Sequence, residues 1–191
     1  MQLPNILTLS RIVMIPIFVA LFYLPFRWAN EASMAVFVLA AFTDWLDGYL
    51  ARRMKLTSRF GAFLDPVADK LMVAAALVLI VDWNPTPFAG WLLAMPATVI
   101  IGREITIAAL REWMAELGER ARVKVSWLGK VKTTAQMTAL PMLIYRDPVG
   151  PLDVGLIGFV LLYVAAVLTI WSMIQYLRAA WPLLMEGAAG D

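Results

Sequence analysis

Residues 44–70 read DWLDGYLARRMKLTSRFGAFLDPVADK, and they bring four aspartates into a chain that is otherwise mostly apolar. Asp44 and Asp47 are three residues apart, so on a helix their carboxylates share one face. The same face would carry Gly48, Ala51 and Arg52. The first half of the stretch therefore predicts a helix that presents two carboxylates and two small residues on one side.

The second half of the stretch repeats this arrangement with a different spacing. Gly61, Asp65 and Asp69 follow one another at intervals of four residues, which lines one face of a second helix. A short basic segment, residues 53–59, separates the two patterns, so we expect the helices to be antiparallel neighbours. This arrangement would fold the two aspartate pairs toward each other.

Four carboxylates that face one another repel, and in a low dielectric most of them would take up protons. A divalent cation reverses this tendency, because Mg²⁺ and Mn²⁺ prefer hard oxygen ligands. One or two such ions, bound by Asp44, Asp47, Asp65 and Asp69, could bridge the nucleophile and the leaving group of a phosphoryl-type transfer. The alternatives are acids that serve as paired structural charges, or acids that form a path for protons or cations.

The chain has 191 residues, of which 62% are hydrophobic, and its mean hydropathy is +0.76. These values predict an all-α integral membrane protein that forms one bundle domain over residues 1–191. The chain has no cysteine and no histidine, which excludes thiolate chemistry and the commonest general base. A proton acceptor would have to be a carboxylate, a lysine or a metal-bound oxygen. The scattered basic residues give no support for binding to nucleic acid.

The apolar stretches predict a bundle of six transmembrane helices. The expected spans cover residues 5–25, 32–52, 62–81, 91–111, 127–145 and 154–178, each to within a few residues. Helical spacing continues beyond the fourth span into residues 111–120, whereas we expect the tail from Met185 to be frayed.

The distribution of cations sets the orientation of this bundle. With both termini in the cytoplasm, the cations that lie inside are Arg11, Arg178 and those of residues 52–59 and 111–132. Only Arg27 and Arg146 then lie outside. The aspartate pairs are thereby predicted at the cytoplasmic ends of the second and third helices.

A second polar cluster lies on the fourth and fifth predicted helices. Arg103 and Arg111 are eight residues apart and share a face, and residues 129–136, GKVKTTAQ, open the fifth helix. Cations beside metal-bound carboxylates suit an anionic, phosphorylated acceptor. We expect this acceptor to be held by Arg103, Arg111, Lys130, Lys132, Thr133 and Gln136. Alternatively, Arg103 is neutralised by the adjacent Glu104 or by a carboxylate of another helix.

The aspartate pattern also carries a resemblance. Asp44-x-x-Asp47-Gly48-x-x-Ala51-Arg52, followed after eight residues by Gly61-x-x-x-Asp65-x-x-x-Asp69, resembles the signature of the CDP-alcohol phosphotransferases. These are membrane enzymes that move a phosphatidyl group from a CDP-linked lipid to an alcohol. The segments LPNILTLSRI, IGREI, ALREWMAELG and SWLGKVKTTAQM are similar to the branch of this family that makes phosphatidylglycerophosphate, so the resemblance covers nearly the whole chain.

This resemblance implies CDP-diacylglycerol as the donor, sn-glycerol 3-phosphate as the acceptor and Mg²⁺ or Mn²⁺ as the cofactor. It implies direct attack by the acceptor hydroxyl, with Asp69 as the candidate general base, and departure of CMP. It also implies a homodimer in a bacterial-type inner (plasma) membrane, with the active site facing the cytoplasm. The residues that it assigns to the CDP-lipid are Asn5, Thr8, Gly48, Ala51, Arg52, Ser58 and Gly61.

The first helix carries Asn5, Thr8 and Arg11 at intervals of three residues. The resemblance suggests that this face helps to cradle the nucleotide or the diphosphate. Alternatively, Arg11 extends its charged head to the membrane interface, and Thr8 is a hydroxyl that packs between helices.

Rival functions differ in what they require of the sequence. Another acceptor, such as serine, an inositol phosphate or a second phospholipid, would use the same chemistry, although serine needs a pocket for a carboxylate and an ammonium group. A cation or proton carrier would use the aspartates as a conduction path, but it has no need of Gly48, Ala51 and Gly61. A purely structural membrane protein leaves four acids in helical register unexplained.

Overall fold

The computed structural model describes residues 3–26, 28–54, 59–116 and 127–188, and these residues form six helices. The helices are α1 (Leu3–Phe22), α2 (Ala29–Met54), α3 (Arg59–Trp83), α4 (Gly90–Glu116), α5 (Trp127–Tyr145) and α6 (Val154–Ala188). Within the described residues the only β-type pairing is one isolated bridge, between Val149 and Leu152. The predicted all-α class is therefore confirmed.

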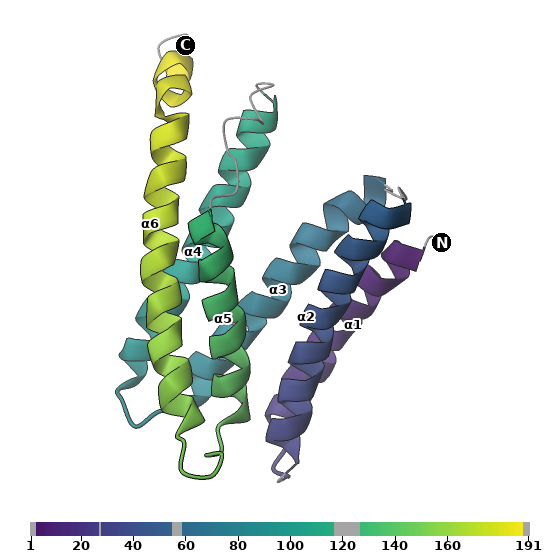
Figure 1. Ribbon diagram of the computed structural model, residues 1–191, viewed down its shortest axis with the longest axis vertical. Helices are drawn as coiled ribbons and strands as arrows, with labels where there is room; N and C mark the ends of the chain where they lie inside the picture. The colour runs from purple at the N-terminus through teal and green to yellow at the C-terminus, as the bar shows by residue number, and fades with distance from the viewer. Residues whose placement is uncertain (1–2, 27, 55–58, 117–126, 189–191) are drawn as a thin grey trace.

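The helices form two groups of three (Figure 1). α1 packs against α2 and α3, while α6 packs against α4 and α5, and the groups meet where α2 contacts α5 and α3 contacts α4. Successive helices run in opposite directions along the long axis of the molecule. The start of α1 and the ends of α2, α4 and α6 therefore point toward the same end, which we call the terminal end.

The apolar core lies toward the opposite end, where α1 connects to α2, α3 to α4 and α5 to α6. It is built around the Phe18 and Phe37 rings, whose centroids are 6.0 Å apart, and around Leu77 and Leu143, which are fully buried. In α6, a Cβ atom at Gly158 would stand 3.1 Å from the carbonyl oxygen of Ala139. Glycine at this position is what lets α5 and α6 approach so closely.

Two helices have the length and composition of a membrane span. These are α4 and the Val154–Trp181 part of α6, and only 33% of each apolar window is buried inside the molecule. Large apolar side chains that face outward, among them Val78, Trp91 and Val167, are more than half exposed. Such a surface is unfavourable in water and favourable in lipid, so the fold is consistent with a membrane protein.

The helix boundaries differ from the expected spans at a few positions. α2 and α3 begin three residues earlier than the second and third spans, at Ala29 and Arg59. The predicted extension of the fourth helix is confirmed as far as Glu116. The prediction of a frayed tail is wrong for residues 185–188, because α6 continues to Ala188, and the rest of that tail lies outside the described residues. Methionine, glutamate and alanine have high helix propensities, which offset the low propensity of the one glycine in this turn.

Candidate active site

Polar side chains from all six helices gather in the half of the bundle nearer the terminal end. Thr8 and Arg11 lie near the start of α1, Asp47 lies toward the end of α2, and all three side chains are buried. Lys132 and Gln136 lie near the start of α5 and are also buried. Burying so many polar groups in one place is costly unless they satisfy one another or a ligand.

Three of the predicted aspartates converge on one guanidinium group. Arg11 forms ion pairs with Asp44, with Asp47 through Oδ2 at 3.1 Å and with Asp65 through Oδ1 at 3.4 Å. The Thr8 hydroxyl, which has one proton to donate, lies within hydrogen-bond distance of both Asp47 Oδ2, at 3.1 Å, and Asp65 Oδ1. Helices α1, α2 and α3 are thus joined by one polar cluster, which we call the carboxylate cluster; Thr8, Arg11 and Asp47 are buried in it, whereas Asp44 and Asp65 are partly exposed.

The position of Arg11 settles one alternative. The residue is only 2% exposed, so the interpretation that it extends its head to the membrane interface is wrong. A snorkelling arginine keeps its charge in water, whereas Arg11 turns inward because three carboxylates supply the compensating charge. α1 therefore contributes a cation to the same site as the aspartates of α2 and α3.

The oxygen atoms of the carboxylate cluster suit a divalent cation by their chemistry. Asp47 Oδ1 is buried and has no hydrogen-bond partner among the described residues, although an anionic oxygen in such a place needs one. Within the part of the chain that the structure describes, however, no three acidic side chains stand in an arrangement that could hold one ion. Arg11 lies among them and supplies the positive charge that Mg²⁺ or Mn²⁺ would otherwise bring.

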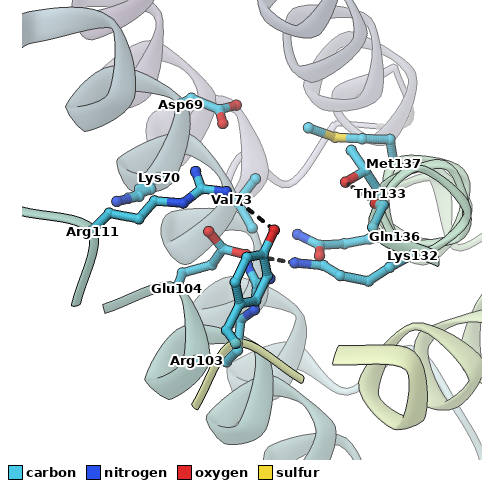
Figure 2. A pocket seen from close by; sticks show the side chains of 12 residues that line it. Asp69, Lys70, Val73, Arg103, Glu104, Arg111, Lys132, Thr133, Gln136 and Met137 are labelled. Atoms are coloured by element: carbon cyan, nitrogen blue, oxygen red, sulfur yellow. Dashed lines mark hydrogen bonds and ion pairs between the residues drawn. The ribbon is translucent and has the colours of Figure 1, made fainter. Parts of the chain in front are cut away.

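A cavity of about 230 Å³ lies between α3, α4, α5 and α6, and we call it the cationic cavity. Figure 2 shows Asp69 and Lys70 on one side of it and Lys132, Thr133, Gln136 and Met137 on the other. Its lining consists of Asp69, Lys70, Val73, Arg103, Glu104, Arg111, Gly129, Lys132, Thr133, Gln136, Met137 and Tyr176. Four cations and two carboxylates leave an excess of positive charge, which suits a phosphate monoester.

Glu104 organises two of the cations in this cavity. Its Oε1 accepts from Arg103 Nη1 at 2.9 Å and from Lys132 Nζ at 2.6 Å. The alternative in which Arg103 is neutralised by its neighbour is therefore correct for this arrangement, but Glu104 cannot neutralise both cations. The carboxylate holds the α4 and α5 cations together at the wall of the cavity, and a net charge remains for a ligand.

Asp69 links the carboxylate cluster to the cationic cavity. It lines the cationic cavity, and it also lines a small neighbouring cavity together with Arg11 and Asp44. The remaining aspartates contact Arg11 directly, whereas Asp69 makes no ion pair with it within the described residues. Its carboxylate is thus placed between the two halves of the site.

Of the six residues predicted to hold the acceptor, the structure places five at the cationic cavity and one outside it. Lys132, Thr133, Gln136, Arg103 and Arg111 line the cationic cavity, whereas Lys130 is exposed and does not line it. Residues 129–136 are expected to open the fifth helix, but α5 begins at Trp127, so both lysines lie within the helix.

Of the residues assigned to the CDP-lipid, Gly61 is buried and Gly48 is half-buried. Asn5, Ala51 and Arg52 lie in helices, but their side chains fall outside the described part, and Ser58 lies outside the described residues altogether.

Sequence reasoning did not assign Lys70, Glu104 or Tyr176 to the site. Glu104 was weighed only as a neutralising neighbour of Arg103. Lys70 directly follows Asp69 in the sequence, and this adjacency could have suggested that Lys70 lies near the site. For Tyr176, the signal was its spacing of four residues from Ser172 in an apolar helix, which puts two polar side chains on one face.

Comparison with known proteins places this arrangement of paired aspartates on adjoining helices in a family of transferases. The chain belongs to the CDP-alcohol phosphatidyltransferase family, whose model matches residues 1–171. The predicted family, and with it the predicted class of enzyme, is confirmed.

The names of individual relatives state a more specific activity than the family description does. The chain is 61% identical over 187 residues to CDP-diacylglycerol–glycerol-3-phosphate 3-phosphatidyltransferase of Sodalis glossinidius, which covers 97% of this chain and 98% of the relative. It is 57% identical over 186 residues to the protein of that name from Yersinia enterocolitica, with the same coverage. The protein of that name from Salmonella paratyphi A is 56% identical over 179 residues, or 94% of each chain.

Proposed function

We propose that this chain transfers the phosphatidyl group of CDP-diacylglycerol to sn-glycerol 3-phosphate and releases CMP and phosphatidylglycerophosphate. The names of its relatives support this assignment. The observation that carries it is the position of Asp69, which lines both the cationic cavity and the cavity beside Arg11 and Asp44. A group in that position can touch an acceptor on one side and a donor on the other.

The carboxylate cluster forms the donor side of the proposed site. Asp44, Asp47, Asp65 and Asp69 are the oxygen ligands that would hold one or two Mg²⁺ or Mn²⁺ ions, which would neutralise charge on the diphosphate. Because no three of these described side chains surround one point as they stand, ion binding would require the aspartates paired with Arg11 to move away from it. The Thr8 hydroxyl lies between Asp47 and Asp65 and shares its one proton with their carboxylates, which orients them relative to each other. By the resemblance to the family, Gly48, Ala51 and Gly61 would allow the nucleotide to approach the helix backbones, and Asn5, Arg52 and Ser58 would be further contacts.

The cationic cavity forms the acceptor side. Arg103, Arg111 and Lys132 would bind the phosphate of glycerol 3-phosphate through charge-assisted hydrogen bonds. Thr133 and Gln136 line the same cavity and offer hydrogen bonds to the glycerol hydroxyls. Lys130, which is exposed, would contribute only to the electrostatic field at the entrance.

Asp69 is the proposed general base. The primary hydroxyl of the acceptor attacks the lipid-side phosphorus, its proton passes to the Asp69 carboxylate, and the bond to the CMP oxygen breaks. A carboxylate is a weak base for an alcohol, with a pKa gap of roughly ten, so the proton moves only as the new bond forms. Charge stabilisation by Arg11 and the cations of the cavity contributes the larger share of the acceleration.

The membrane arrangement is part of the proposal. All six helices would cross a bacterial-type inner membrane with both termini in the cytoplasm, which sets both halves of the site toward the cytoplasm. Because the chain has no cysteine, single cysteines can be introduced at Thr86 and Glu116 and treated with a membrane-impermeant maleimide. Labelling of intact cells at Thr86 alone is expected, and the reverse result would overturn the orientation. The homodimer implied by the family would be tested by the mass of the detergent-solubilised protein.

The decisive assay follows CMP release from purified protein supplied with CDP-diacylglycerol. We expect release with sn-glycerol 3-phosphate and none with serine, an inositol phosphate or a second phospholipid. Release with one of the other acceptors alone would reassign the substrate. Ion flux into vesicles without CDP-lipid, in the absence of any CMP release, would favour the cation or proton carrier instead.

A further inference from the structure

Tyr176 belongs to no part of the mechanism described so far, although it is the only α6 residue that lines the cationic cavity among the described residues. We propose that Tyr176 is a positioning residue, which holds the Arg103 and Arg111 guanidinium groups together as a clamp for the phosphate of the acceptor. This proposal rests on the proposed function, since it assigns the source of selectivity for a phosphorylated acceptor.

Two arginines reach one aromatic ring. Arg103 and Arg111 lie eight residues apart on α4, so their backbones are separated by about 12 Å along the helix axis. Both guanidinium carbons nevertheless lie 5.5 Å from the centroid of the Tyr176 ring. Arg111 Nη2 also donates a hydrogen bond to the Tyr176 hydroxyl, at 3.3 Å. Both guanidinium groups therefore lie against the same ring, although their backbones belong to different turns of α4.

The Tyr176 ring is itself fixed in place. It is 7% exposed and packs in a separate apolar cluster with Ile107, Leu110, Met114 and Ala180. Ile107 and Leu110 lie on α4 between the two arginines in sequence, so the ring is held by the same helix turns that carry its partners. A ring packed in this way offers the guanidinium groups a rigid surface rather than a mobile one.

The two arginines depend on Tyr176 to different degrees. Arg103 also pairs with Glu104 at 2.9 Å and donates to the Ser172 hydroxyl at 3.3 Å. Within the described residues, Arg111 makes no ion pair, and its polar contacts are both with Tyr176. Removal of the ring should therefore displace Arg111 more than Arg103. The ring also reduces the cost of holding two like charges close together before a phosphate arrives.

Two substitutions separate the contributions of Tyr176. Tyr176→Leu removes the ring and the hydroxyl, and should raise the KM for glycerol 3-phosphate by about tenfold, while the KM for CDP-diacylglycerol and kcat change by less than about threefold. Tyr176→Phe keeps the ring in its apolar cluster, and should raise the acceptor KM by only about threefold. The matched control is Tyr163→Leu, because Tyr163 lies on the same helix but donates to the carbonyl oxygen of Leu92, far from the cavity.

A double-mutant cycle tests whether Tyr176 acts through Arg111. The acceptor KM of Tyr176→Leu combined with Arg111→Ala should hardly exceed that of Arg111→Ala alone, whereas the combination of Tyr176→Leu with Lys132→Ala should be close to multiplicative. The inhibition constant for inorganic phosphate should rise in parallel with the acceptor KM. If Tyr176→Leu acted only by disturbing the fold, it would raise the acceptor KM by the same factor in the Arg111→Ala and Lys132→Ala backgrounds, and it would lower the melting temperature.

The outcomes distinguish this inference from the function on which it rests. A wild-type protein that releases no CMP with glycerol 3-phosphate would refute the proposed function. A wild-type protein that does so, with an unchanged acceptor KM in Tyr176→Leu, would overturn the role of Tyr176 alone. Equal effects of Tyr176→Leu and Tyr163→Leu, or equal increases in donor and acceptor KM, would also overturn it.

Discussion

The two ends of the bundle bury charge for different purposes. Near the terminal end, Arg11 meets three carboxylates and one buried oxygen of Asp47 is left without a partner. At the opposite end, Arg146 lies over the Phe22 and Trp83 rings, at 3.8 and 4.8 Å from their centroids, and donates to the Phe22 carbonyl oxygen. There a single cation lies against two aromatic rings and one carbonyl oxygen, and its Nε atom has no hydrogen-bond partner among the described residues.

The contacts around Arg146 are typical of a structural clasp. Tyr23 donates to Asp82 at 2.7 Å, and Asn30 donates to Asp147 at 3.1 Å, so the three helix connections at this end are tied together. Burial lowers the pKa of the Arg146 guanidinium from its ordinary value, but an arginine remains charged at neutral pH. Both ends hold a buried atom without a hydrogen-bond partner in the described part of the chain, namely Arg146 Nε and Asp47 Oδ1. The difference is that Arg146 is covered by two ring faces, whereas the Asp47 oxygen is anionic and can accept a bond from a cationic ligand.

The largest effect should follow from changing Asp69. Asp69→Asn removes the proposed base while keeping the size of the side chain, so kcat should fall by about a thousandfold. The KM values for both substrates should change little, and the melting temperature should not fall, because a half-buried negative charge, which makes no ion pair with Arg11 in the described part of the chain, is removed. CMP release under saturating conditions provides the measurement. Substantial turnover by this variant would show that the proton goes elsewhere.

Removal of divalent ions should have the next largest effect. EDTA is expected to reduce CMP release by at least about a hundredfold, and Mg²⁺ or Mn²⁺ should restore it. A second measurement does not depend on activity: Mg²⁺ should raise the melting temperature of the wild-type protein by binding the folded state. The same addition should have no effect on Asp47→Asn. Equal stabilisation of both proteins would place the ion outside the carboxylate cluster.

The site was only partly predictable from the sequence, and the aspartates show why. Spacings of three and four residues fix which side chains share a helix face, and Asp44, Asp47 and Asp65 do meet at one guanidinium. The direction of Arg11 was not predictable, because a cation near the start of an apolar helix has the same sequence pattern whether it points to water or inward. That direction depends on the rotation of α1 against α2 and α3.

The position of Tyr176 was also not predictable from the sequence, for a related reason. In the sequence it is one aromatic residue in a long apolar helix, and it gains its position only because α6 packs against α4. The composition and the spacing of apolar segments predicted six helices, since hydrophobicity acts locally along the chain. Which faces of α4 and α6 meet is decided by packing between segments some 70 residues apart, as in the bond from Arg103 to Ser172.

A third test compares two lysines of α5. Lys132 is buried and bonded to Glu104 at 2.6 Å, whereas Lys130 is exposed. Lys132→Ala should raise the acceptor KM by about tenfold or more, because a buried charge-assisted contact is lost. Lys130→Ala should raise it by less than about threefold, since exposed charges contribute little. Equal effects of the two substitutions would move the acceptor out of the cationic cavity and toward its entrance.

The smallest expected effect on catalysis comes from the opposite end. Arg146→Ala removes two cation–π contacts and the hydrogen bond to the Phe22 carbonyl oxygen. The free energy of unfolding should fall by about 1–2 kcal/mol, while kcat and both KM values stay within about twofold of wild type.

Arg146→Lys separates charge from shape in this clasp. Lysine keeps the positive charge but lacks the planar group that lies over two rings, so it should recover only part of the lost stability. Thermal unfolding in detergent, followed in parallel with CMP release, would measure both quantities. A loss of activity without a loss of stability would mean that the two ends are coupled, and that charge buried at the connections also shapes the site. If stability alone changes, the bundle keeps its chemistry and its clasp in separate halves, because α1, α3 and α5 each carry a reactive residue near one terminus and a closing contact near the other.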